Sequence, residues 1–139
     1  MRISEALAAA RANQQSVLTT MRRDGLPQLS NVVHGVDDQG VIRVSTTADR
    51  AKYANLRRRP WAALKVDGAS FWSYAVLEGD VTLSAVAETP DDAAVEELVG
   101  LYRALSGEHE DWAEYRDAMV THRRVVVRLH PTRAYGMLR

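Results

Sequence analysis

Short runs of β-branched and aliphatic residues, separated by tight-turn signals, constrain the fold of this chain more than any other feature. Three such runs lie near the start of the sequence. Each turn between them holds an Asp and a Gly, residue types that favour a positive backbone φ. In chain order, the strands and turns are residues 16–21, 23–27, 28–36, 37–40 and 41–45. We therefore expect residues 16–46 to form a three-stranded antiparallel meander.

Further strands and several helices are predicted from their own sequence signals. The predicted helices are one capped by Ser4, one over 47–59 with Asp49 as its cap and Pro60 as its stop, one over 91–106 and one over 112–121. The remaining predicted strands are 61–66, 74–83 with a bulge at Gly79, and 124–129, after which Pro131 begins a tail. No strand–helix–strand alternation runs through the chain, which disfavours a doubly wound parallel sheet. About six antiparallel strands with inserted helices favour a closed or partly closed barrel, because closure removes exposed sheet edges.

Length and composition exclude several classes of protein. A chain of 139 residues is expected to form a single domain spanning 1–139. The absence of cysteine excludes disulfides, thiolate zinc sites, iron–sulfur clusters and cysteine nucleophiles. The four histidines lack metal-ligand spacing, so no metal site is expected. No apolar run approaches the roughly 18 residues of a membrane span, so we expect a cytoplasmic protein without a membrane partner.

The net charge is zero, but the charges are segregated along the chain. Residues 88–117 hold ten acidic and two basic residues, whereas residues 50–59 hold five basic residues and no acidic one. An anionic ligand is therefore expected near 50–59 and not near 88–117. The Arg57–Arg59 run leaves a nucleic-acid-binding module as an alternative. The zero net charge and the lack of an RNA-binding aromatic motif argue against it, so no nucleic-acid partner is expected.

The segment from Ser45 to Leu56 is the first candidate site. It places hydroxyls, including that of Thr46, at a strand end and two cations, Arg50 and Lys52, at the start of a helix. Hydroxyls, guanidinium groups and the free N–H groups of a first helical turn all bind phosphate oxygens. Arg50 and Lys52 converge on one anion only if Arg50 lies before the helix proper. The competing interpretation is a solvent-exposed basic helix, which is the more common use of a charge run.

Two further segments carry polar or aromatic groups suited to a flat ring. Gln28 and Ser30 share one face of a strand, with Asn31 on the other, and such side chains read the polar edge of a heterocycle. An ordinary polar strand face is the alternative. Trp72 and Tyr74 enter a strand from a loop, where aromatic groups stack on a planar ring or close an interface.

Taken together and in this order, these motifs resemble the split β-barrel flavin and deazaflavin oxidoreductases of the pyridoxamine 5′-phosphate oxidase-like superfamily. Within it, the chain is similar to the small branch that uses the deazaflavin coenzyme F420. The segments that carry the resemblance are residues 24–32, Arg50-Ala51-Lys52 with residues 55–58, residues 72–79, and residues 101–120.

The resemblance implies a mainly β, antiparallel Greek-key split barrel that forms a homodimer, with two cofactor sites at the subunit interface. Lys52 and Arg50 would hold the cofactor phosphate with help from Ser45 and Thr46 or Thr47. The implied cofactor-binding residues are Gln28, Ser30, Asn31, Ser45, Thr46, Arg50, Lys52, Asn55, Trp72 and Tyr74. The acidic helix 91–106 becomes an element on the solvent side.

The function implied by the resemblance is hydride transfer from reduced F420 to an electron-poor substrate, such as a bilin, quinone or xenobiotic. No catalytic residue is assigned, and Tyr74, His34 and His122 are the candidates for a proton donor. One alternative is an FMN-binding enzyme of the pyridoxamine phosphate oxidase type. Another is a protein that binds F420 without catalysis.

Overall fold

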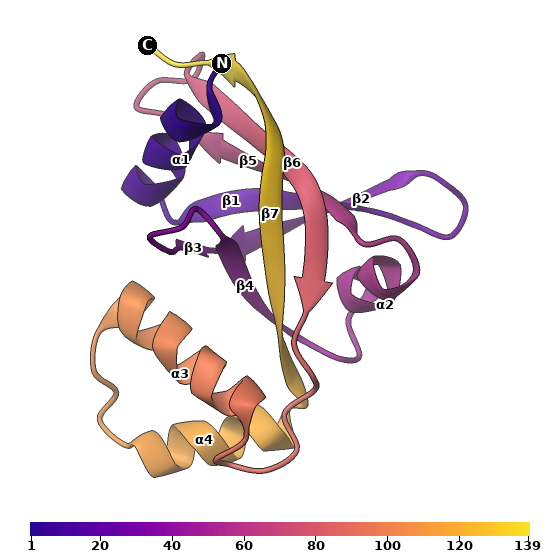
Figure 1. Ribbon diagram of the computed structural model, residues 1–139, viewed down its shortest axis with the longest axis vertical. Helices are drawn as coiled ribbons and strands as arrows, with labels where there is room; N and C mark the ends of the chain where they lie inside the picture. Colours follow the sequence, from indigo (N-terminus) through magenta and orange to yellow (C-terminus); the bar gives the residue numbers. More distant parts are fainter.

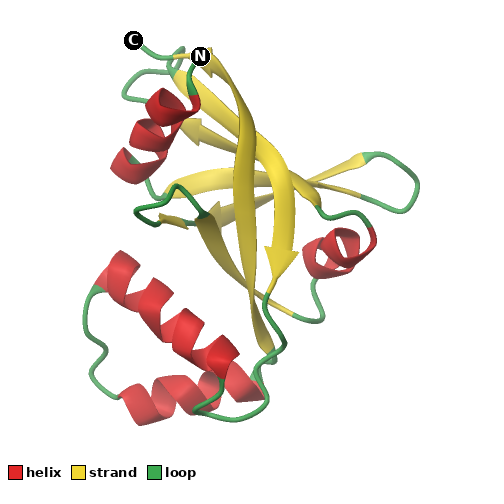
Figure 2. Ribbon diagram, in the orientation of Figure 1, coloured by secondary structure: helices red, strands yellow, loops and turns green.

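The computed structural model describes residues 1–139 and consists of one strongly curved antiparallel sheet with four helices (Figures 1 and 2). Its seven strands follow the order β2-β1-β5-β6-β7-β4-β3. Their bounds are β1 Gln15–Met21, β2 Pro27–Val33, β3 Gly35–Val36, β4 Ile42–Thr47, β5 Trp61–Asp67, β6 Tyr74–Leu83 and β7 Arg124–Met137. The sheet confirms the predicted antiparallel, partly closed barrel, with seven strands where about six were expected. The short β3 accounts for the difference.

Alternating burial along the strands explains why the sheet curls around a single core. In β1, Ser16, Leu18 and Thr20 are buried, and the residues between them are partly exposed. β4 and β5 show the same alternation, so their aliphatic residues point into the barrel. Leu18, Leu64 and Leu77 are among the fully buried side chains of this core. Successive side chains of a strand point to opposite faces, and this period of two decides which of them fill the interior.

The predicted three-stranded meander over 16–46 is wrong. The segment 28–36 is not one strand, because the chain bends at His34 and divides it into β2 and β3. β2 pairs with β1, whereas β3 pairs with β4, and the other edge of β4 pairs with β7. The bend is fixed by the buried ring of His34, whose Nδ1 lies 2.7 Å from Ser16 Oγ and whose Nε2 lies 2.8 Å from the carbonyl oxygen of Ala10.

The last strand is longer than the predicted 124–129, because β7 continues through the expected tail to Met137. Pro131 is accommodated opposite Gly79, where the register between β6 and β7 shifts at the predicted bulge. The two backbones approach so closely there that a Cβ on Gly79 would overlap the carbonyl oxygen of His130. A residue without an N–H group is tolerated at such a bulge, so the ladder resumes beyond it.

Four helices occupy the connections between strands: α1 Ile3–Ala12, α2 Ala51–Arg58, α3 Ala93–Ser106 and α4 Trp112–Thr121. Two of the predicted starts are corrected. The first helix begins at Ile3 after Arg2, without a side-chain cap. The second is shorter than 47–59 and follows Arg50, again without a side-chain cap, so Asp49 does not cap it. Asp92 does cap α3, because its carboxylate accepts a hydrogen bond from the Val95 N–H.

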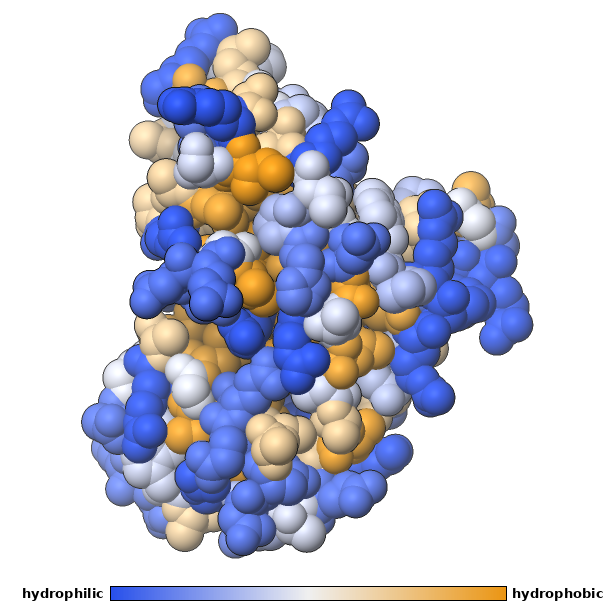
Figure 3. Space-filling view, in the orientation of Figure 1, coloured by the Kyte–Doolittle hydropathy of each residue, from blue (hydrophilic) through white to orange (hydrophobic).

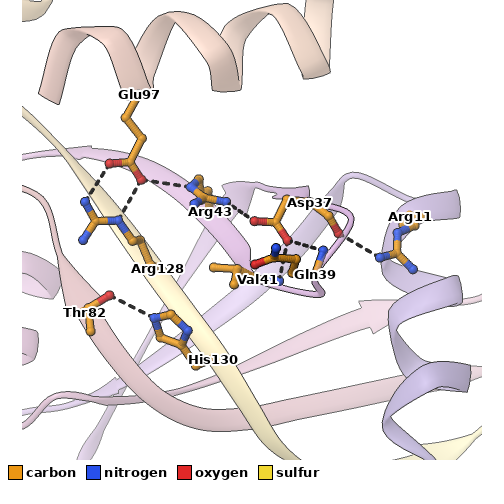
Figure 4. Close-up of polar contacts among 9 residues, drawn as sticks. All are labelled: Arg11, Asp37, Gln39, Val41, Arg43, Thr82, Glu97, Arg128 and His130. Carbon is orange, nitrogen blue, oxygen red and sulfur yellow. Dashed lines mark hydrogen bonds and ion pairs between the residues drawn. The ribbon is translucent and has the colours of Figure 1, made fainter. Parts of the chain in front are cut away.

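Helices α3 and α4 form a hairpin at one end of the barrel, with a small core of its own (Figure 1). An ion-pair network attaches this hairpin to the sheet (Figure 4). Glu97 of α3 accepts hydrogen bonds from Arg128 of β7 at 2.6 and 2.7 Å and from Arg43 of β4 at 2.9 Å. Arg43 also donates to Asp37 at 2.6 Å. The acidic helix is therefore bound to basic strands, which departs from the expected role on the solvent side.

No helix of the structure is both long enough and apolar enough to cross a membrane.

Candidate functional site

A cavity of about 420 Å³ opens where the curled sheet fails to close, between β2 and β4. These two strands are not hydrogen-bonded neighbours, but the curvature of the sheet brings them into contact. Residues 31–33 of β2, residues 45–47 of β4, and Leu101 and Leu105 of α3 form its walls. We call this space, together with the cations described next, the cation pocket.

Three cations line the cation pocket: Arg50, Lys52 and Arg124. None of them forms an ion pair with a carboxylate of the chain. Burial, together with repulsion from Arg50 and Arg124, lowers the pKa of Lys52. An anion bound here would relieve both effects, because it would supply the missing opposite charge.

Arg124 is the member of the set that carries a buried donor without a partner. Its Nη1 lies 3.4 Å from Ser45 Oγ, a long contact, and its Nε is buried without a hydrogen-bond partner. Buried donors without a partner are rare in folded proteins, and a site that binds a polar ligand is one place where they occur. This donor, together with the hydroxyl of Ser45, fits an oxyanion such as a phosphate.

The backbone before α2 allows Arg50 and Lys52 to act on the same anion. Arg50 occupies the N-cap position with extended backbone angles (φ −81°, ψ 149°), and Lys52 lies in the first turn. This is the arrangement that the sequence required for the two cations to converge. Asp49 does not line the pocket. Its carboxylate accepts a hydrogen bond from the Thr47 hydroxyl, which is the main cause of the lowered pKa of Asp49.

Gln28, Ser30 and Asn55 lie outside the lining of the cation pocket. The Asn55 amide donates to Gln28 Oε1 at 2.9 Å and to Thr20 Oγ1 at 3.1 Å, and Asn55 Oδ1 accepts from Arg58 at 3.0 Å. Both amide hydrogens of Asn55 are therefore engaged within the chain. In this structure, Asn55 and Gln28 tie α2 to the sheet and so fix the helix that carries Lys52.

The side chain of Thr46 is buried with the core. Thr46 also lines the cation pocket, because it lies in β4 between Ser45 and Thr47. Asn31 faces outward from β2 and lines the pocket. Of the three ring-edge candidates on β2, it is the one that reaches this space.

Trp72 and Tyr74 lie at the opposite end of the barrel from the cation pocket. Tyr74 is paired with Met137 of β7, and Ser45 is paired with Val126 of the same strand, eleven residues away. At about 3.3 Å per residue, this corresponds to roughly 35 Å of strand. Trp72 is 68% exposed and contacts the ring of Phe71, with 4.7 Å between the ring centroids. Neither aromatic group reaches the cation pocket within a single chain.

The comparisons with known proteins agree with this architecture. The sequence model of the pyridoxamine 5′-phosphate oxidase family matches residues 3–138. The chain belongs to this family. A solved structure described as an F420 reductase is 25% identical, with a TM-score of 0.63, and the match covers 92% of this chain and 94% of that one.

Other solved structures share the split barrel of this family. A conserved hypothetical protein from Mycobacterium tuberculosis is 25% identical over 96% of this chain and 82% of its own, with a TM-score of 0.73. A pyridoxamine 5′-phosphate oxidase homologue from Listeria innocua is 18% identical over 96% of both chains, with a TM-score of 0.68. Proteins described as FMN-binding and heme-binding, at 17% and 19% identity, show the fold alone.

Several residues that line the cation pocket were not predicted from the sequence, among them Arg124, Leu101 and Leu105. Arg124 reaches the pocket because β7 pairs with β4, where it stands opposite Thr47. The two leucines reach it because α3 packs against β7 and β3, the two neighbours of β4 in the sheet. The basic run after His122 was the available signal for Arg124, but only the long-range strand pairing gives it a place.

The two histidine candidates occupy different environments. His34 is completely buried, and burial lowers its pKa below the usual value of 6.5. Both of its ring nitrogens are engaged with Ser16 and Ala10, so the structure places His34 in the core and away from a substrate. His122 is exposed after α4 and lines a polar cavity of about 490 Å³ with Arg50 and Arg124, next to the cation pocket.

Replacing His34 by alanine is expected to lower the free energy of unfolding by about 2–3 kcal/mol, because it leaves a cavity and two unsatisfied polar groups. The lowered pKa of His34 also implies a pH effect. Its contribution to stability is present above pH 6.5 and is lost as the pH falls towards the folded-state pKa. Urea denaturation at pH 7 and pH 5 measures both effects. His122→Ala is the control, and an equal loss of stability in that variant would contradict the prediction.

Proposed function

We propose that this protein binds coenzyme F420 and transfers a hydride between its deazaflavin ring and an electron-poor substrate of bilin, quinone or xenobiotic type. The observation that carries the proposal is the cation pocket, in which Arg50, Lys52 and Arg124 lack opposite charges and one buried donor lacks a partner. The likeness to an F420 reductase at 25% identity supports the choice of cofactor.

The residues of the pocket fit the anionic linker of such a cofactor. Lys52 and Arg50 supply charge from the start of α2, Arg124 supplies the unsatisfied Nε, and the Ser45 hydroxyl lies beside it. Charge-assisted hydrogen bonds of this kind are about twice as strong as neutral ones. Leu101 and Leu105 line the pocket from α3 and form an apolar wall beside this anchor.

When bound, the deazaflavin supplies the hydride at C5, and the protein supplies binding, orientation and a dry environment. Asn31 stands on the path from the cation pocket along β2, where its amide can donate to or accept from the edge of a ring. His122 lies beside the anchor and is exposed, so it is placed to exchange protons with solvent there.

We further propose that two copies of the chain form a homodimer that completes each site. Large apolar side chains remain exposed on the sheet face and at the barrel end that carries Trp72, among them Leu29 (62%), Phe71 (85%) and Met137 (46%). A partner subunit that covers this surface would bring its Trp72 and Tyr74 towards the other subunit's ring site. Such patches on soluble proteins commonly mark association surfaces.

Trp72→Ala is expected to reduce hydride transfer while leaving anchoring of the linker nearly unchanged, because Trp72 lies far from the three cations. Steady-state kinetics and cofactor titrations separate the two effects, and light scattering reports the oligomeric state. A monomer that binds the cofactor as tightly as the wild type and turns over at the same rate would contradict the role of the dimer.

An FMN-dependent activity is the second candidate, because a single phosphate fits the same three cations and a protein of this fold is described as FMN-binding. Binding of F420 without catalysis is the third. The decisive experiment titrates the purified protein with F420 and with FMN, followed by the fluorescence of its three tryptophans. Turnover is then tested with reduced F420 and a quinone. Tight binding of FMN alone would overturn the proposal, and binding of F420 without turnover of any acceptor would reduce it to a binding protein.

A further inference from the structure

A second cavity, of about 450 Å³, lies beside the cation pocket on the outer face of the sheet. It is lined by Asn13, residues 15–17, residues 31–33, Lys65 and Asp67. Residues 31–33 line both cavities, so the two spaces adjoin at the edge strand β2. A ligand anchored by its anionic group in the cation pocket would extend past this strand into the second cavity.

Lys65 is the one cation among the outward-facing residues of β1, β2 and β5. The register places Asn31, Val17 and Lys65 side by side across the three strands. Two strand spacings of about 4.8 Å separate the backbones of Asn31 and Lys65 by about 10 Å. A flat ring lying over Val17 would therefore have an amide at one side and an ammonium group at the other.

The immediate surroundings of Lys65 leave its charge available to a ligand. Asp67 of the same strand forms an ion pair with Lys65, and their side chains are 45% and 64% exposed. Exposed ion pairs of this kind contribute little to stability, and their side chains rearrange easily. The Lys65 ammonium also lies 5.9 Å from the centre of the Tyr74 ring, at the edge of the same face. A ring that covered this face would exclude water and strengthen its interaction with Lys65.

We propose that Lys65 is a positioning residue that binds the pyrimidine edge of the cofactor ring and favours its reduced form. This inference rests on the proposed function. Hydride addition brings two electrons and one proton to the ring, so the ring gains one negative charge, shared between N1 and the C2 carbonyl oxygen. A cation beside this edge stabilises the reduced state more than the oxidised state. Asp67 lies in the same cavity and carries the opposite charge, so it disfavours the reduced state relative to the oxidised state.

The test measures the dissociation constants of oxidised and reduced F420, and from them the reduction potential of the bound cofactor. Lys65→Met is expected to weaken binding of reduced F420 about tenfold more than binding of oxidised F420. This difference lowers the reduction potential of the bound cofactor by about 30 mV for a two-electron couple. Asp67→Asn is expected to raise it. Lys65→Arg should restore most of the wild-type value. Arg57→Met, at an exposed position of α2 outside both cavities, makes the same change of charge and should leave the potential unaltered.

Binding of the deazaflavin ring compound without its phosphate linker gives a second readout. Lys65→Met should weaken binding of this compound, whereas Lys52→Ala should weaken binding of the complete coenzyme only. An unchanged potential and unchanged ring affinity in a folded Lys65→Met protein that still binds F420 would overturn the role of Lys65 and leave the proposed function standing. Failure of the wild-type protein to bind F420 would overturn both.

Discussion

Replacing Lys52 by alanine is expected to weaken the binding of F420 by about 10- to 150-fold, the equivalent of about 1.5–3 kcal/mol for a lost charge-assisted hydrogen bond. Lys52 lies in the first turn of α2, and its pKa is lowered by burial and by its cationic neighbours. Binding of an anion must therefore raise the pKa of Lys52 again. The affinity for F420 should fall as the pH rises through the pKa that Lys52 has in the ligand-free protein. Isothermal titration calorimetry at several pH values measures both effects.

Arg124→Ala should weaken F420 binding by a similar factor. The Lys52→Ala/Arg124→Ala double variant should lose less binding free energy than the sum of the two single losses, because both side chains act on one anion. Arg57→Ala is the matched control, since Arg57 is a cation of the same helix that does not line the pocket. If the affinity of Lys52→Ala equals that of the wild type, Lys52 is not part of the binding site. An equal loss of F420 affinity in Arg57→Ala would show that the net charge of the protein, and not a specific contact of Lys52, determines the binding.

Replacing Glu97 by glutamine is expected to lower the free energy of unfolding by about 2–3 kcal/mol. Breaking a buried ion pair costs about 3–5 kcal/mol, and the partial exposure of this network reduces that figure. Glu97 is 19% exposed and receives both Arg43 and Arg128, which would lose their shared carboxylate. Thermal unfolding measures the loss, at about 3 °C per kcal/mol for a chain of this size.

The same network predicts a pH dependence. Burial alone would raise the pKa of Glu97, but hydrogen bonds from Arg128 and Arg43 outweigh it and lower the pKa below the usual value of 4.5. A lowered folded-state pKa means that this contribution is present above pH 4.5 and is lost as the pH falls below it. Glu97→Gln should remove that part of the acid sensitivity.

Glu96→Gln is the control for this prediction, because Glu96 lies on the same helix and pairs with Arg116 in an exposed position. It should change the stability little. Because α3 carries Leu101 and Leu105 into the cation pocket, Glu97→Gln should also increase amide hydrogen exchange in α3 and weaken F420 binding modestly. Unchanged exchange in α3 would show that the small core of the helical hairpin holds it without the ion pairs.

The sequence predicted local structure well where a repeating pattern or a capping residue acts within a few positions. The strands over 16–21 and 61–66, the helix over 91–106 and the bulge at Gly79 all follow from neighbouring residues. The limits of α2 were less accurate, because the Asp49 carboxylate bonds to the Thr47 hydroxyl instead of capping the helix.

Long-range pairing was the main feature that local patterns could not supply. The expected meander failed because one buried histidine, His34, bends the chain and divides it into β2 and β3. The edge of β4 that β3 leaves open pairs with β7, some eighty residues further on. Only this pairing brings Arg124 to Ser45. The failure of Gln28 and Asn55 to reach the pocket has the same origin, since hydrogen bonds between α2 and the sheet engage their amides.

By itself, the sequence determined that the chain is an antiparallel β protein with a basic segment at the start of a short helix, because strand period and local charge depend on adjacent residues. The tertiary structure alone decided that this segment faces a third cation and two leucines across an open seam of the barrel. It also separated Trp72 and Tyr74 from that seam. Curvature of the sheet is the physical reason, since it sets which distant strands meet and which ends stay apart.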